Sequence, residues 1–188
     1  MMFYKSKDFC MGLKVEIDNQ PYTIIENKFI SPGKGKAFNK LKLKNVINKS
    51  IIQKTIKIGT KLKSADIIFT DAIYLYNDQD IYFFINIKTK EYHEVLKDIL
   101  LNEKKWLKEG LTYSLISWNK KIIAIKPPKF IELKVLSVNN VTEGTMTAKN
   151  LKHSMLETGI SIKVPLFIKN NDIIKIDTEQ EAYVARMN

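Results

Sequence analysis

The chain of 188 residues is poor in the residues that build disulfides, metal sites and catalytic sites. It contains one cysteine, Cys10, and two histidines, His93 and His153. A single cysteine excludes an intrachain disulfide, and a reducing compartment fits this usage. Because no metal-ligand spacing occurs, we expect no metal and interpret the histidines as surface residues. No G-x-S-x-G nucleophile elbow is present either, and the sequence does not predict an enzyme.

Long apolar runs are also missing. No stretch of 18 or more apolar residues occurs, and the amino-terminal sequence MMFYKSKDFCMG lacks the apolar region and cleavage site of a secretion signal. We therefore expect neither a membrane span nor export, and we expect a cytoplasmic protein. With 45% hydrophobic residues, the chain can bury a core as one large domain or as two to three small domains.

Negative charge is scarce in the first third of the chain. Residues 1–65 hold fourteen lysines and four acids, a net charge of +10, whereas the whole chain carries +11. Compositional drift toward lysine, in a chain with Arg186 as its only arginine, explains the abundance of lysine but not its segregation. The imbalance favours a polyanion-binding amino-terminal domain over a merely solvated surface.

The apolar pattern predicts short strands separated by turns. Residues 14–58 contain four such segments, KVEID, YTIIENKFI, KAFNKLKLKNVIN and SIIQKTIKI, which predict a small basic β-barrel. After the polar residues 59–66, two hairpins are expected, one around residues 77–80 and one around Asn119-Lys120. The last part repeats this plan with FIELKVLSV, a polar loop of about twenty residues, GISIKVPLFI, DIIKID and EAYVARM.

The fold class expected from these segments is all-β, with three small domains at residues 1–64, 65–128 and 129–188. The second boundary lies at Pro127-Pro128, because neither residue can donate a backbone hydrogen bond to a strand ladder. One short helix is expected in the second domain, within VLKDILLNEKKWLKEG. There Leu96, Ile99, Leu100 and Leu107 recur at helical spacing as core residues, and Gly110 supplies a stop.

A glycine-lysine loop joins two strands of the first domain, with the sequence Ser31-Pro32-Gly33-Lys34-Gly35-Lys36. It lacks the spacing and following helix of a phosphate-binding P-loop, and the third glycine of the dinucleotide fingerprint. The remaining interpretation of the loop is a type II turn, in which Pro32 fixes φ at one corner and Gly33 adopts the positive φ that the next corner requires. The residues alone leave two alternatives, an exposed functional lysine and a plain hairpin with an incidental lysine.

The stretch SPGKGKAF followed by a basic strand resembles the tip loop of bacterial translation elongation factor P. PPKFIEL and KVPLFI resemble the later domains of that family, so the resemblance covers essentially the whole chain. The family's carboxy-terminal signature is similar to KHSMLETGISIKVPLF, with matches at Lys152, Gly159, Val164 and Pro165. The resemblance implies a KOW/SH3-like barrel followed by two OB-like barrels, in an L-shaped arrangement similar to tRNA.

In function, the resemblance implies a factor that binds the ribosome between the peptidyl and exit tRNA sites and promotes peptide-bond formation at consecutive prolines. It implies that Lys34 positions peptidyl-tRNA and receives a lysine-derived extension in some bacteria. The expected partners are the ribosome, peptidyl-tRNA, ribosomal RNA and lysine-modifying enzymes, with no membrane and no bound cofactor, and the chain is expected to be a monomer. Further expected sites are the phosphate-binding residues Lys40, Lys42 and Lys44 and an exit-site codon loop at Gly144 and Thr145.

Two other functions are compatible with parts of the sequence. A general single-stranded RNA-binding protein with OB domains would explain the basic first domain. The bases of the bound RNA would stack on Tyr74, Tyr76, Phe83 or Phe84, although these aromatic residues could equally be core residues. The eukaryotic and archaeal factor five-A family is the other alternative, but it has two domains and this chain has sequence for three.

Overall fold

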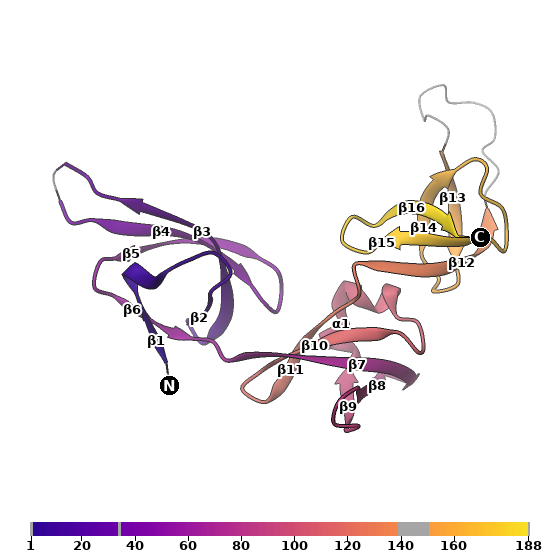
Figure 1. Cartoon of the computed structure of the whole chain (residues 1–188), viewed down its shortest axis with the longest axis horizontal. Coiled ribbons are helices and arrows are strands. Elements are labelled where there is room, and N and C mark those ends of the chain that lie inside the picture. The colour runs from indigo at the N-terminus through magenta and orange to yellow at the C-terminus, as the bar shows by residue number, and fades with distance from the viewer. Residues whose placement is uncertain (1, 34, 139–150, 188) are drawn as a thin grey trace. The chain divides into compact units, whose positions relative to one another are not determined.

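The computed structural model describes residues 2–33, 35–138 and 151–187 (Figure 1). These residues form three β-sheets with little helix, which confirms the predicted all-β class. The chain divides into two compact units, Met1–Thr70 with Leu115–Ala124 and Asp71–Ser114 with Ile125–Asn188. In the described ranges no helix has the length and apolar character needed to span a bilayer.

The first sheet has six strands and surrounds an apolar core. Its order is β1 (Phe3–Lys5), β6 (Lys61–Ser64), β2 (Lys14–Ile17), β3 (Gln20–Ile30), β4 (Phe38–Asn45) and β5 (Ile51–Lys57), and the 3-10 turn η1 (Ser6–Asp8) follows β1. Successive side chains of a strand point to opposite faces, so Leu41 and Leu43 of β4 are fully buried beside Val15 and Ile24. The strands β1 and β6 were not predicted, since both are short and β6 has the mostly polar sequence KLKS.

The second sheet contains both predicted hairpins. Its order is β11 (Lys121–Lys126), β10 (Thr112–Trp118), β7 (Ile67–Asp78), β8 (Ile81–Asn86) and β9 (Tyr92–Leu96). Asn119 and Lys120 have φ values of 50° and 64°, as a tight type I′ turn requires. The Tyr113 hydroxyl donates a hydrogen bond to the Trp106 carbonyl over 2.9 Å, and burial raises the pKa of Tyr113 to about 12, which keeps this donor protonated.

The short helix expected in the second domain is present, but it covers only part of residues 95–110. β9 continues to Leu96, and only α1 (Lys97–Leu100) and the 3-10 segment η2 (Leu101–Trp106) follow. Val95 pairs with Tyr82 in the sheet, and Leu101 has a φ of +47°, so a continuous helix cannot form. Leu100 is buried as expected, but Leu96 is 57% exposed, which corrects its assignment to the core.

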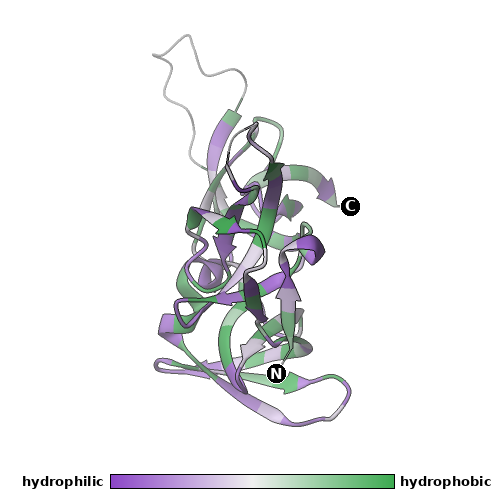
Figure 2. Cartoon of the chain, turned by 90° about the vertical axis from the view of Figure 1, so that its left-hand side faces the viewer, coloured by the Kyte–Doolittle hydropathy of each residue, from purple (hydrophilic) through white to green (hydrophobic). Residues whose placement is uncertain are grey.

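The third sheet closes around the second large core. Its order is β14 (Ser161–Pro165), β13 (Leu151–Leu156), β12 (Phe130–Val138), β15 (Ile173–Asp177) and β16 (Ala182–Met187), and the two end strands lie against each other. Trp106 from η2 packs into this core beside Leu133. β13 was predicted as part of a polar loop, and this was wrong because its residues alternate between two faces, with Leu151, His153 and Met155 exposed while Ser154 and Leu156 point inward. Figure 2 shows hydrophilic and hydrophobic residues alternating along several other strands.

Candidate nucleic-acid interface and tip loop

A long hairpin of the first sheet carries the glycine-lysine loop. β3 and β4 pair from Tyr22 opposite Asn45 to Ile30 opposite Phe38, which leaves residues 31–37 as the connection. Figure 1 shows this hairpin projecting from the rest of the first sheet, with the connection at its end. Phe29, beside the loop, is 63% exposed. The fold therefore presents the loop at the far end of two strands.

The backbone of the loop differs from the predicted turn. Ser31, Pro32, Gly33, Gly35 and Lys36 are exposed, and Lys34 lies outside the described residues. The positive φ occurs at Gly35, with a value of +111°, and not at Gly33, so the predicted type II turn is wrong. A side chain at Gly35 would meet only Pro32 Cγ, at 3.7 Å. The requirement for glycine at this position is therefore conformational rather than steric.

Two asparagines fasten the hairpin to the segment after β1. Asn27 Nδ2 donates a hydrogen bond to the Phe9 carbonyl over 2.8 Å, and Asn39 Nδ2 donates one to the Ser6 carbonyl over 2.9 Å. Asn39 is buried, so its hydrogen bond is shielded from water. These contacts, which the sequence did not predict, attach both strands of the hairpin to residues 6–9.

Four lysines line the outer face of the hairpin, and we call them the basic face: Lys28, Lys40, Lys42 and Lys44. The last three alternate with the buried leucines of β4, so the structure brings together the three phosphate-binding candidates. The register adds Lys28 opposite Lys40 and places Glu26 opposite Lys42. Sequence reasoning missed Lys28, because only the strand register shows which face it occupies.

The charges of the basic face are largely uncompensated. Lys28 Nζ lies 2.7 Å from Glu26 Oε1, and this hydrogen bond and charge, with smaller effects of Lys42 and Lys40, hold the pKa of Glu26 below its ordinary value. One carboxylate thus faces four lysines. A pocket of about 100 Å³ is lined by Glu26 and by three of these lysines, Lys28, Lys40 and Lys42. Such a surface can bind phosphate groups, and it carries no means of reading bases.

The residues of the carboxy-terminal signature come together in the β13–β14 hairpin. Lys152 lies opposite Val164, and Pro165 ends β14. Val164 is fully buried in the core of the third sheet. Gly159 has a φ of +82° and donates a backbone hydrogen bond to Leu156 over 2.8 Å in the connecting turn. These residues build the hairpin, while the codon-loop candidates Gly144 and Thr145 lie outside the described residues.

The aromatic candidates for base stacking separate into two pairs. Tyr74 and Phe84 are buried in the core of the second sheet, so they are unavailable to a nucleic acid. Tyr76 is 51% exposed and stacks on Phe83 with 4.8 Å between the ring centroids. Only the second pair can offer a ring to solvent.

The histidine and cysteine side chains do not assemble into a site. Among residues 2–33, 35–138 and 151–187, no group of three or more His, Cys, Asp or Glu side chains could hold a metal ion. Cys10 and His153 are exposed. His93 was predicted to lie on the surface, but it is only partly exposed, and its Nε2 atom is enclosed without a hydrogen-bond partner in the described part of the chain.

Comparison with known proteins identifies related sequences along the whole chain. Residues 5–62 match a family model described as the elongation factor P KOW-like domain. Residues 68–125 match its OB domain, and residues 131–186 match its C-terminal domain. Elongation factor P of Blochmanniella floridana is 38% identical over 186 residues, which are 99% of this chain and 100% of that protein.

Two solved structures share the fold over part of the chain. One is eukaryotic translation initiation factor 5A from Methanococcus jannaschii, with 20% identity and a TM-score of 0.53. The other is an eif-5a family protein from Naegleria fowleri, with 14% identity and a TM-score of 0.52. Each covers 66% of this chain, while 93% and 97% of their own chains are covered. A third of this chain has no counterpart in them, which disfavours the factor five-A alternative.

Proposed function

Because the chain belongs to the elongation factor P family, we propose that this translation elongation factor promotes peptide-bond formation at consecutive prolines by positioning peptidyl-tRNA through Lys34. The factor binds the ribosome between the peptidyl and exit tRNA sites. The observation that supports this proposal is the exposed loop at the end of a long hairpin whose outer side is the basic face.

The proposed mechanism is positional. A prolyl amine is a constrained nucleophile, and a proline-containing nascent chain can pull the reacting ester out of line. Holding the acceptor end of peptidyl-tRNA restores the geometry of attack, and orientation of two reactants can remove on the order of several kcal/mol from a barrier. Lys34 therefore needs to reach the tRNA end, and it does not need to donate or accept a proton.

The basic face supplies the affinity that holds the loop in place. Lys40, Lys42 and Lys44 have no ion pair or hydrogen bond through their side chains to any other residue that the structure describes. They are available to phosphates of tRNA and ribosomal RNA, with salt-dependent and sequence-independent contacts. A lysine-derived extension on Lys34, added by modifying enzymes, would lengthen the reach of the loop. Gly144 and Thr145 remain the proposed contact to the exit-site codon.

The test is peptide-bond formation on ribosomes stalled at a triple-proline template. Protein purified from its native host is compared with Lys34→Ala and with Lys36→Ala, a matched lysine in the same loop. We expect rescue by the native protein and by Lys36→Ala, and none by Lys34→Ala. Equal rescue by the two variants, or no rescue by the native protein despite confirmed ribosome binding, would contradict the proposal.

A general single-stranded RNA-binding protein is the second candidate. The exposed, stacked pair of Tyr76 and Phe83 favours it, since bases stack on such rings. Under this alternative, Lys34→Ala and Lys36→Ala weaken RNA binding equally and neither affects stalled ribosomes. The same experiment therefore separates the two functions.

A further inference from the structure

A groove on the third sheet has the composition of a ligand site. It lies between the β13–β14 hairpin and the start of β16 and has a volume of about 520 Å³. Its lining includes Leu151, His153, Lys163, Pro165, Glu181 and Tyr183. We call it the β13–β16 groove. All of these residues belong to one compact unit, so the groove is a feature of that unit alone.

The lining of the groove includes two nitrogen-bearing side chains on paired residues of the hairpin. His153 lies opposite Lys163 in the strand register, and both are exposed. The pair on one side of them is Leu151 and Pro165, which gives an apolar surface. Lys163 forms no ion pair or side-chain hydrogen bond within the described ranges. The hairpin thus offers an apolar patch beside two groups that can bind an anion.

The opposite wall is fixed and nearly neutral. Glu181 is the acid of the groove, and its Oε1 atom lies 2.6 Å from Lys105 Nζ, so its charge is compensated. Tyr183 packs against the core of the third sheet while it also lines the groove. Its ring is therefore held in place, and it can serve as a contact surface for a planar group at little cost in side-chain entropy.

The position of the groove in the fold indicates the class of ligand. In OB-folds, oligonucleotides bind on the face of strands 2 and 3, beside the loop between strands 4 and 5. In the third sheet β13 and β14 are the second and third strands, and Glu181 ends the connection from β15 to β16. The β13–β16 groove thus lies where OB-folds bind nucleic acid.

We propose that the β13–β16 groove binds a nucleotide of single-stranded RNA. The base lies on the apolar patch beside Tyr183, and the phosphate is bound by Lys163 and His153. A peptide is the competing occupant, but two adjacent cationic or hydrogen-bonding groups suit a phosphodiester better than a neutral backbone. The site needs neither Lys34 nor the basic face, so it goes beyond the function proposed above.

The experiment is a titration of the full-length protein with a uridine trinucleotide, followed by NMR at 0.1 M salt. A local readout is needed because the basic face also attracts RNA. We expect saturable shifts of the His153 imidazole and of the Lys163 and Tyr183 amides. Lys163→Ala should weaken this binding about fivefold at 0.1 M salt, since one phosphate contact to a single strand contributes a salt slope of about 0.7.

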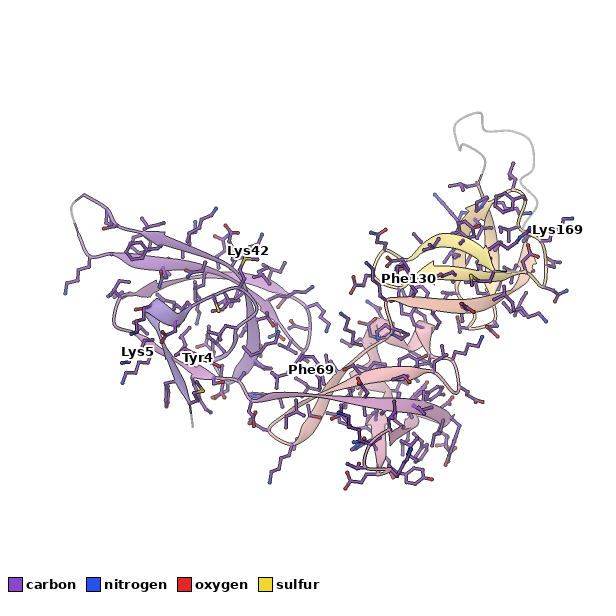
Figure 3. All side chains as sticks on the ribbon, viewed as in Figure 1. Tyr4, Lys5, Lys42, Phe69, Phe130 and Lys169 are labelled. Atoms are coloured by element: carbon purple, nitrogen blue, oxygen red, sulfur yellow. The ribbon has the colours of Figure 1, made fainter. Side chains whose placement is uncertain are left out.

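Lys169→Ala is the matched control. This lysine is exposed in the same compact unit and outside the groove lining, and Figure 3 labels it. The control should bind as tightly as the native protein, and unchanged Val164 signals in both variants verify the fold. The proposal is wrong if the shifts are confined to the first sheet, if both variants bind equally, or if a proline-rich peptide shifts these residues and the trinucleotide does not. None of these outcomes involves ribosomes, so the function proposed above is tested separately.

Discussion

Removal of two lysines from the basic face should weaken binding to tRNA by a calculable amount. The variant is Lys40→Ala with Lys42→Ala, two exposed or half-exposed side chains on the outer face of β4. Both lie near the pocket that also includes Lys28. Neither lysine contributes to the apolar core, so we expect the folded state to persist and the loss to appear in RNA affinity.

The magnitude follows from counterion release. Each phosphate contact contributes a slope of about 0.7 to 0.9 in log affinity against log salt concentration. Loss of two contacts should therefore lower the slope by about 1.4 to 1.8 and weaken binding about 25- to 60-fold at 0.1 M salt. Fluorescence anisotropy with labelled tRNA, repeated over a series of KCl concentrations, measures both quantities.

The control variant removes the same charge from a different part of the same sheet. Lys5 and Lys61 are exposed and lie opposite each other in β1 and β6, at the far end of the strand order from β4. Figure 3 labels Lys5 and Lys42. We expect Lys5→Ala with Lys61→Ala to change the slope by much less. An equal change in both double variants would refute a defined phosphate-binding face and leave only the net charge as the cause.

Three further outcomes are expected. Gly35→Ala places a side chain on a residue with a φ of +111°, which costs about 1–3 kcal/mol in the loop and should reduce rescue of proline stalling. Gly33→Ala, with open space around it, should be tolerated. Equal effects of the two variants would contradict this. Asn39→Ala leaves a carbonyl of η1 without its donor and should lower the free energy of unfolding by about 1–3 kcal/mol in urea denaturation; an unchanged midpoint would contradict the anchoring. Burial acts to raise the pKa of Glu157, but hydrogen bonds and charge, led by Lys108, hold this pKa below its ordinary value of 4.5. The contribution of ionised Glu157 to the stability of the fold is therefore complete above pH 4.5 and is lost as the pH falls through the lowered pKa. Glu157→Gln should flatten the decrease of the free energy of unfolding at acid pH, and an unchanged decrease would exclude this role.

The periodicity of the chain predicted most strands but not the full binding face. Lys40, Lys42 and Lys44 were predictable as one face, because side chains alternate within a single strand. The face on which Lys28 lies depends on a β-bulge between Ile24 and Glu26. In a regular strand Lys28 would share the buried face of Ile24, and the extra residue moves it to the outside. A bulge of this kind has no signal in a single sequence.

The errors in the loop and the helix both arose from local sequence patterns. The turn expected at Gly33 assumed a reversal within four residues, but the connection spans residues 31–37, and the positive φ shifted to Gly35. The apolar residues of 95–110 fit a helical period, yet Val95 forms strand pairs with β8. Strand pairing decided the outcome for residues 95–96, and local propensity was a weak guide to both segments.

The burial of Trp106 in the core of the third sheet limits how the chain can be divided. This indole comes from η2, far before the predicted boundary at 128, yet it packs beside Leu133 and Leu156 and is 1% exposed. A fragment that starts at residue 129 would lose one of the largest side chains of its own interior. Segment 129–188 is therefore not an interchangeable module. A recombinant chimera that joins it to a foreign second domain would fold well only if that domain supplied an equivalent aromatic residue.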